Sequence, residues 1–196
     1  MQIVDTALSS VKIIEPEVFG DERGFFLESW NREAFEALDL PGGFVQDNHS
    51  RSARGVLRGL HYQIDRPQGK LVRVTAGAVF DVAVDLRRES PEFGRWAGVE
   101  LTAGNRRQLW VPPGFAHGFL VLSASADFLY KCTEYYAPMH ERSLAWNDPD
   151  VGIDWPLAEG EVPTLSRKDS AAASLADCEV FEGMIGNDAA SMARAA

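Results

Sequence analysis

Short stretches of extended-strand character, separated by Gly, Pro, Asn and Asp, dominate this chain and restrict it to a few β architectures. Residues 79–86 alternate well, as on a strand with one core-facing side. The apolar face comprises Phe80, Val82, Val84 and Leu86, and the other face carries Asp81 and Asp85. The expected strands are Val11–Ile14, Gly24–Glu28, Val56–Gln63, Leu71–Thr75, Val79–Leu86, Trp96–Leu101, Gln108–Val111, Gly118–Leu122 and Phe128–Tyr135. Many short strands with few helices predict a mainly β protein, either a sandwich, a jelly roll or a small barrel.

Helices are expected at two places only. The first is Arg32–Leu38, capped by Asn31 and ending before Pro41, and the second is a short one at Ala171–Leu175. The 196 residues, 45% of them hydrophobic, suffice for one core, and neither a repeat nor a linker interrupts them. We therefore expect a single domain over residues 1–183, with a frayed tail at 184–196.

The charge and the cysteines exclude several classes of function. A formal net charge of −10 argues against nucleic acid and anionic membranes as partners. A phosphorylated ligand would need arginines and lysines gathered locally. Cys132 and Cys178 form neither a disulfide framework nor a zinc pattern. With no secretory signal and no apolar run long enough to cross a membrane, we expect a cytoplasmic protein.

The segment Arg58–Gln63 places polar and ionisable side chains in a stretch that otherwise resembles a buried strand, and this favours a functional site. Together with Pro112–His117, it resembles the paired motifs of the cupin superfamily. His61 and His117 match two metal-ligand positions, but Gln63 and Lys70 stand where a His and a Glu are expected. A protonated lysine repels a divalent cation and an amide is a weak ligand. We therefore expect a cupin-type jelly-roll β-barrel with no metal and no cofactor.

Further motifs make the resemblance closer and extend it from Met1 to about Ala173. In order and content they are similar to those of the dTDP-4-dehydrorhamnose 3,5-epimerase family. This resemblance implies an isomerase of dTDP-L-rhamnose biosynthesis that inverts C3 and C5 of dTDP-4-dehydro-6-deoxy-glucose through enolates. The matching runs are Gly20–Phe26, Phe44–Ser50, Val56–Gln63, Gln68–Arg73, Phe80–Asp85, Gly114–Phe119, Phe128–Lys131 and Trp146–Asp148.

The resemblance also implies roles for individual residues. His61 is the expected base with Asp169 as its carboxylate partner, Lys70 stabilises the enolate oxygen, and Tyr130 is the acid on the opposite face of the sugar. Tyr130 shares a strand face with Phe128 and Cys132, whereas Lys131 points the other way. Tyr136 matches the aromatic that stacks on thymine. The expected substrate-binding residues are Arg23, Glu28, Gln46, Asp47, Asn48, Arg58, Lys70, His117, Tyr136, Glu141 and Lys168.

Two structural expectations accompany these roles. Arg58 and His61 are three positions apart and would point to opposite faces of a regular strand, so a bulge or twist is expected at Gly59. The resemblance also implies a homodimer in which the N-terminal strand crosses to the partner, so that Arg23 and Glu28 serve the neighbouring site.

Three other functions remain open at this point. A relative that inverts only C3 or only C5 would carry the same base and acid. A metal-dependent cupin oxygenase is disfavoured by Gln63 and Lys70. A sugar-nucleotide-binding cupin without activity would bind the ligand but would not exchange its protons with solvent.

Overall fold

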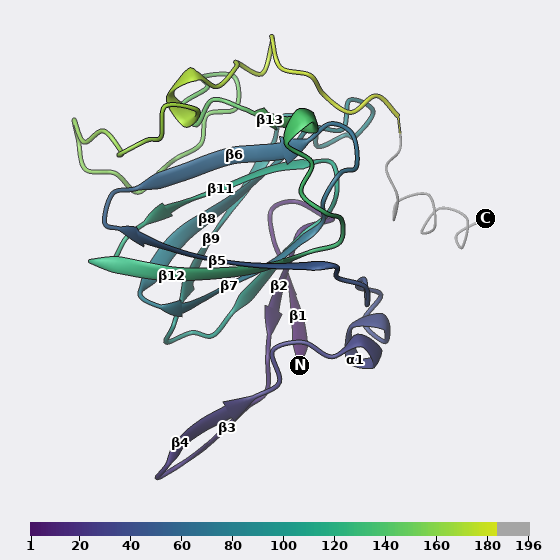
Figure 1. The fold of residues 1–196 in the computed structure, drawn as a ribbon, viewed down its shortest axis with the longest axis vertical. Coiled ribbons are helices and arrows are strands. Elements are labelled where there is room, and N and C mark those ends of the chain that lie inside the picture. Colours follow the sequence, from purple (N-terminus) through teal and green to yellow (C-terminus); the bar gives the residue numbers. More distant parts are fainter. Residues whose placement is uncertain (184–196) are drawn as a thin grey trace.

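The chain folds into two antiparallel β-sheets that face each other (Figure 1). The computed structural model describes residues 1–183, and the tail predicted at 184–196 lies outside the described residues. The larger sheet consists, in spatial order, of β1 (Gln2–Asp5), β2 (Lys12–Glu15), β10 (Gln108–Val111), β7 (Lys70–Ala76), β12 (Ser125–Cys132) and β5 (Gln46–Ala53). The smaller sheet consists of β13 (Glu141–Ser143), β6 (Leu57–Gln63), β11 (Phe115–Val121), β8 (Ala78–Asp85) and β9 (Trp96–Thr102). The mainly β class predicted from the sequence is confirmed.

Two of the three apolar clusters within the described residues lie against the smaller sheet, one on each of its faces. The cluster between the sheets includes Val72 of β7 and Phe128 of β12, both almost fully buried. The cluster on the outer face includes Val82 and Val84 of β8, and the chain that follows β13 covers it with residues such as Trp155. The smaller sheet is therefore buried on both sides, which explains why the aspartates of β8 are as buried as its valines.

The expected helix after Asn31 is present but shorter than predicted. Helix α1 spans Arg32–Glu36, and the side chain of Asn31 accepts a hydrogen bond from the backbone N–H of Ala34 at 3.2 Å, as an N-cap does. The prediction of a helix at Ala171–Leu175 is wrong. A short 3₁₀ helix, η2 (Asp169–Ala171), precedes it, and the chain then extends so that Ala173 bridges to Leu144. None of the described helices has the length and hydropathy required to cross a membrane.

Four strands were not predicted, and β5 is the most instructive. Residues 46–48 alone are typical of a turn, but they begin β5, which pairs with β12 along its whole length. Polar residues are tolerated there because β5 is the last strand of its sheet and one of its faces is exposed to solvent. The other unpredicted strands, β1, β3 (Val18–Asp21) and β13, are no longer than four residues.

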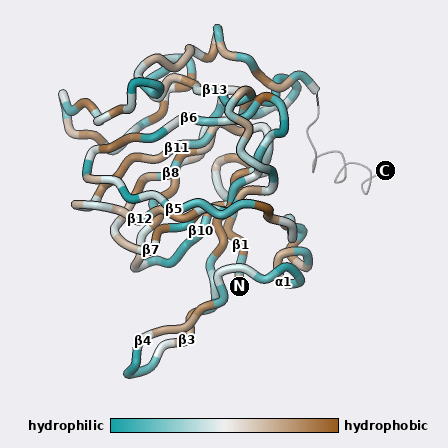
Figure 2. The backbone as a smooth tube through the Cα atoms, viewed as in Figure 1, coloured by the Kyte–Doolittle hydropathy of each residue, from teal (hydrophilic) through white to brown (hydrophobic). Residues whose placement is uncertain are grey.

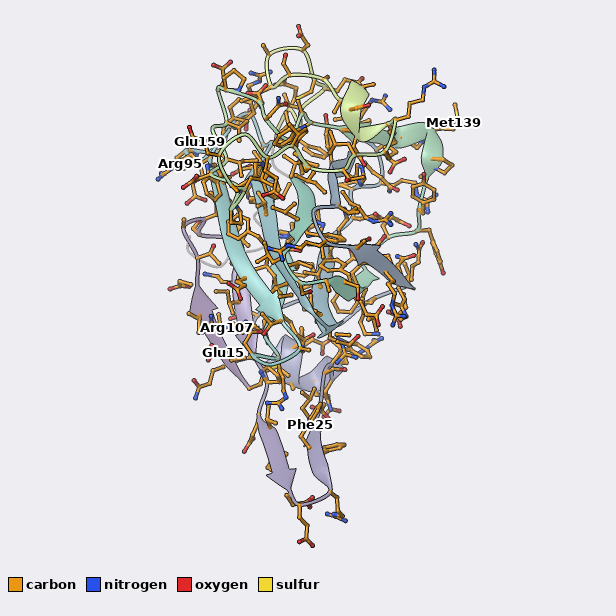
Figure 3. The ribbon with its side chains drawn as sticks, turned by 90° about the vertical axis from the view of Figure 1, so that its left-hand side faces the viewer. Glu15, Phe25, Arg95, Arg107, Met139 and Glu159 are labelled. Atoms are coloured by element: carbon orange, nitrogen blue, oxygen red, sulfur yellow. The ribbon has the colours of Figure 1, made fainter. Side chains whose placement is uncertain are left out.

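An N-terminal hairpin projects from the body of the molecule. It consists of β3 and β4 (Gly24–Leu27), which pair only with each other. Figure 1 shows it at the end of the molecule opposite to β13, and Figure 3 labels Phe25 on it. Its phenylalanines are exposed, Phe26 by 68%, and Figure 2 shows apolar colour along much of its length. An apolar surface of this kind on a projecting arm is typical of a segment that contacts another molecule.

The bulge predicted at Gly59 is confirmed. Between the two flanking pairs, two residues of β6, Gly59 and Leu60, oppose one residue of β11, Gly118, so the antiparallel register shifts. Gly59 has φ +122°, a conformation that side-chain-bearing residues rarely adopt, and its backbone approaches that of Gly118 on β11. The pairs on either side of the bulge are His117 with His61 and Phe119 with Arg58.

Replacing Gly59 with Ala is expected to destabilise the fold. The added Cβ would lie 2.6 Å from the Cα of Gly118 and 2.8 Å from the carbonyl oxygen of His117, and both are backbone atoms that cannot move aside. We expect the free energy of unfolding to fall by at least ~2 kcal/mol in urea titrations. Gly55→Ala is the matched control, because Gly55 also has a positive φ (+74°) but open space around it. Equal losses in both variants would contradict this explanation.

Candidate active site

A hydrogen-bonded pair of His61 and Asp169 is the centre of the candidate site. The Nε2 of His61 lies 2.5 Å from Oδ1 of Asp169, and the carboxylate is almost fully buried. The hydroxyl of Ser166 donates to Oδ2 of Asp169 at 2.7 Å. Both carboxylate oxygens thus accept a hydrogen bond, which fixes the position of the group that orients the imidazole.

The protonation states of this pair suit a base. Burial lowers the pKa of His61, and the charges of Lys168 and Lys70 act in the same direction against the opposing effect of Asp169. Burial alone would raise the pKa of Asp169, but hydrogen bonds from His61 and Ser166 outweigh it and keep the pKa below its ordinary value. An ionised carboxylate can only accept, so Nε2 carries the proton and Nδ1 of the neutral ring has its lone pair free.

Asp169 reaches His61 because its segment is anchored along β6. The backbone of Thr164 exchanges hydrogen bonds with this region, donating to the oxygen of Gly55 at 2.8 Å and accepting from the N–H of Leu57 at 3.0 Å. The turn of η2 then places Asp169 over the middle of β6. The pairing of two residues 108 positions apart, expected only from the family resemblance, is present in the structure.

Behind His61, the interior of the molecule holds a buried group of charged side chains. Lys70 is 8% exposed and donates to the carbonyl oxygen of His61 at 3.2 Å. The Nε2 of His117 lies 2.9 Å from Oδ1 of Asp81, a fully buried carboxylate. Burial lowers the pKa of Lys70 and raises that of Asp81, although the two charges oppose these shifts. Asp81 therefore offsets part of the cost of burying positive charge in the site.

Tyr130 lies on the inner face of β12, as predicted. Its ring centroid is 6.0 Å from that of Phe128, whereas Lys131 points outward and pairs with Asp47. Burial raises the pKa of Tyr130, and the charge of Glu141 adds to this effect, while that of Arg58 opposes it. The phenol therefore keeps its proton at neutral pH, as a proton donor requires.

Glu141 connects the parts of the site. Its carboxylate accepts from the Nζ of Lys168 at 2.5 Å and from the hydroxyl of Tyr136 at 2.9 Å. Burial alone would raise the pKa of Glu141, but Lys168 and Tyr136 lower it below its ordinary value, and His61 also contributes. Glu141 thus lies close enough to interact electrostatically with both the candidate base and the candidate acid.

A cleft of about 370 Å³ opens beside the pair of His61 and Asp169. Arg58 and Lys168 contribute its positive charge, and Ser166 lies on its wall. Because of the bulge at Gly59, Arg58 and His61 line the same cleft although they are three positions apart. These two cations give an anionic ligand in the cleft the local attraction that the overall charge of the protein lacks.

Of the eleven predicted binding residues, Arg58 and Lys168 line this cleft. Asp47 points to the outer face of its sheet and lines a separate cavity of about 230 Å³, whose lining also includes Asn48 and Tyr130. Only the backbone of Asp47 could therefore reach a ligand in the interior. Arg23 is paired with Asp21 on the projecting hairpin, and Glu28 follows that hairpin and accepts from Asn31 at 3.1 Å. Figure 1 shows the hairpin at the opposite end from η2, so within one chain Arg23 does not reach Asp169. The contribution of Arg23 and Glu28 to the site of a partner subunit remains a prediction.

The sequence reasoning missed three residues of the site. The sequence places Asp81 on a strand face but predicts no role for it. An aspartate within an otherwise apolar strand was the signal that could have indicated a buried, functional carboxylate. Ser166 precedes Asp169 by three positions, the spacing at which a serine caps a turn. The sequence predicts Gln63 only as the replacement of a metal ligand, but its amide hydrogen-bonds with the loop before β13. Within residues 1–183, no group of three His, Cys, Asp or Glu side chains is arranged to hold a metal ion.

Replacing Ser166 with Ala is expected to reduce turnover about five- to tenfold, because Asp169 loses one of the two hydrogen bonds that fix it. The loss should also raise the pKa of Asp169, so the acidic limb of the pH–rate profile should move to higher pH. Ser170→Ala is the matched control, since Ser170 lies in the same turn but donates to the oxygen of Arg167. Identical pH profiles for the two variants would argue against this role for Ser166.

Comparison with known proteins identifies the family. A family model described as dTDP-4-dehydrorhamnose 3,5-epimerase matches residues 5–177. The chain belongs to this family. It is 60% identical over 182 residues to the dTDP-4-dehydrorhamnose 3,5-epimerase of Pseudomonas aeruginosa, covering 92% of this chain and 99% of the relative. It is 58% identical to that of Salmonella typhimurium, covering 88% of this chain and 94% of the relative.

The fold agrees with this assignment. The chain is similar to the crystal structure of dTDP-6-deoxy-D-glucose-3,5-epimerase from Legionella pneumophila in complex with dTDP-4-keto-L-rhamnose. The two share 54% identity with a TM-score of 0.90, over 94% of this chain and 99% of the other. The cupin-type fold expected from the sequence is therefore shown by its structural neighbours.

Proposed function

We propose that this protein is a cofactor-independent dTDP-4-dehydrorhamnose 3,5-epimerase. It inverts C3 and C5 of dTDP-4-dehydro-6-deoxy-glucose and yields dTDP-4-dehydro-L-rhamnose. The single observation that best supports this function is the hydrogen-bonded pair of His61 and Asp169 with the buried Lys70 behind it. Tyr130, on the inner face of β12, supplies the proton donor. These groups are the base, the oxyanion stabiliser and the acid that inversion next to a ketone requires.

The difficulty of the reaction explains why all three groups are needed. The α-protons of a ketone are weaker acids than an imidazolium by on the order of ten pKa units, equivalent to ~14 kcal/mol. A base alone cannot overcome this difference. The ammonium of Lys70, held in a buried interior, stabilises the negative charge that develops on the C4 oxygen as the proton leaves.

Each inversion then takes two proton transfers. The free Nδ1 of His61 removes the proton from C3 or C5, and the imidazolium that forms is stabilised by Asp169. Tyr130 delivers a proton to the opposite face of the enolate. Before the next inversion, His61 releases its proton to solvent and Tyr130 regains one from solvent. C3 and C5 both flank the C4 ketone, so one enolate-stabilising group serves both carbons.

The remaining residues of the site bind the nucleotide. Tyr136 offers its half-exposed ring to the thymine, and Arg58 and Lys168 bind the diphosphate, since cationic side chains suit phosphate oxygens. Glu141 accepts hydrogen bonds from both Lys168 and Tyr136 and so fixes the diphosphate-binding residue relative to the thymine-binding residue. The other proposed contacts come from Gln46, Asp47, Asn48 and His117.

We further propose that residues 1–183 act as one domain and that two copies form a homodimer through the N-terminal hairpin. The exposed phenylalanines of the hairpin support this, because burial against a partner would remove apolar surface from water. Arg23 and Glu28 would then complete the neighbouring site. Light scattering across a dilution series tests the dimer, and fully active monomers would contradict it.

A relative that inverts only one of the two carbons would use the same base and acid. Incubating the substrate with enzyme in deuterated water and following C3 and C5 by NMR separates the two functions. We expect deuterium at both carbons of the product. Label at one carbon alone would contradict the 3,5-epimerase.

A further inference from the structure

Gln63 occupies a position at which metal-binding cupins carry a ligand, but its side chain serves another purpose here. It is 3% exposed, and its amide contacts both the loop that joins β6 to β7 and the loop that joins β12 to β13. The Nε2 donates to the carbonyl oxygens of Arg66 at 2.8 Å and Tyr135 at 3.3 Å. The Oε1 accepts from the backbone N–H of Ala137 at 2.8 Å. Every polar atom of this buried amide is thus used.

Two of these three partners are the residues on either side of Tyr136. The amide therefore fixes the backbone immediately before and immediately after that residue. The N–H of Tyr136 itself donates to Oε1 of Gln46 at 2.9 Å, and its hydroxyl donates to Glu141. The ring remains 51% exposed, so little packing holds it in place. Its position depends on these hydrogen bonds.

The chemistry of the position requires an amide. A side chain that contacts two carbonyl oxygens and one N–H must both donate and accept. Among side chains of this length only glutamine does so at neutral pH, because a carboxylate cannot donate and a thioether does neither well. An unpartnered buried backbone group would shift the loop toward water.

We propose that Gln63 is a positioning residue for the ring of Tyr136 and, through it, for the nucleobase of the substrate. The inference rests on the proposed function where it assigns the nucleobase to Tyr136. It accounts for the glutamine at the ligand position: the strand that carries the base His61 also holds the loop that carries the nucleobase contact. Gln63 thereby fixes the position of the Tyr136 ring relative to His61, which lies on the same strand as Gln63.

Binding of dTDP alone, measured by calorimetry in a double-mutant cycle, tests this inference. Gln63→Met is expected to weaken dTDP binding about tenfold. In a Tyr136→Ala background, the same substitution should cause no further loss, because its effect is transmitted through the ring. Gln68→Ala is the control, since Gln68 donates to the oxygen of Glu134 in the same loop at 2.8 Å but does not flank Tyr136. We expect it to leave binding unchanged.

Gln63→Glu provides a second test should Gln63→Met fail to fold. It keeps the acceptor for Ala137 but loses both donated bonds when ionised, so its dTDP affinity should recover relative to wild type as the pH falls. Additive losses in the cycle, or a Gln63→Glu affinity that follows wild type at all pH values, would overturn the assignment of Gln63 alone. Failure of the wild-type protein to bind dTDP would overturn both this assignment and the proposed nucleotide site. Exchange at C3 and C5 tests the epimerase activity separately.

Discussion

Replacing His61 with Asn is expected to abolish most solvent exchange at C3 and C5 while leaving binding of the dTDP-sugar nearly intact. Asn retains an N–H that can donate toward Asp169, but it has no basic lone pair. A positioned general base contributes about 10²- to 10⁴-fold, so we expect both exchange rates to fall by roughly 10³-fold. Deuterium incorporation followed by NMR measures the rates, and calorimetry with dTDP measures binding.

The control is His49→Asn, because His49 lies on the outer face of β5 and is largely exposed. It should exchange as fast as the wild type. The pH profile of the wild type gives a second check. Burial places the pKa of His61 below its ordinary value of 6.5, so exchange should rise with pH through a pKa lower than that of a free imidazole. Unchanged exchange in His61→Asn would favour a base elsewhere, and no exchange even in the wild type would favour a cupin that only binds the nucleotide.

Replacing Lys70 with Met is expected to cause the second large loss of solvent exchange at C3 and C5. The substitution keeps an unbranched chain of similar length in a buried position but removes the charge that stabilises the enolate. Loss of one such group typically costs about 10²- to 10³-fold, and we expect both carbons to be affected equally because they share one enolate oxygen. The measurement is again deuterium exchange, with dTDP affinity as the check on folding and binding.

The pH dependence of the wild type should also reveal Lys70. Burial lowers its pKa, so the ammonium is lost and exchange declines as the pH rises through a value below the ordinary 10.5. This decline should be absent in Lys70→Met. Lys12→Met is the control, since Lys12 pairs with Asp5 at the protein surface. Exchange in Lys70→Met within a few-fold of wild type would remove Lys70 from the reaction.

The sequence predicted the strands that have apolar residues on their core-facing sides. It failed where tertiary contacts decide the conformation. Residues 46–48 favour a turn by their own chemistry, but β12 offers them a complete ladder of partners. Ala171–Leu175 has helical propensity, yet the bridge between Ala173 and Leu144 holds it extended. In both cases a partner distant in sequence outweighs a weak local preference.

In the candidate site, too, local spacing could be predicted from the sequence and contacts between distant residues could not. Spacing within one strand was enough to predict the bulge at Gly59, because two residues that are three positions apart on a regular strand point to opposite faces. No local pattern indicated that Asp169 meets His61, since a carboxylate in a polar turn is usually solvated, and only the family resemblance paired them. The role of Gln63 in holding the loop was invisible in the sequence, because the partners of its amide are backbone atoms.

The anchoring of residue 164 beside β6 has a consequence for the order in which activity is acquired. All strands of both sheets precede residue 144, so their pairing depends on chain that is synthesised before Asp169 emerges. The carboxylate proposed to orient His61 belongs to a later segment, which also covers the outer face of the smaller sheet through Trp155. A nascent chain ending near residue 160 would contain every strand that the structure describes and would still lack the carboxylate that pairs with His61. The proposed base therefore gains its orienting partner only with the part of the chain that follows the sheets in the sequence.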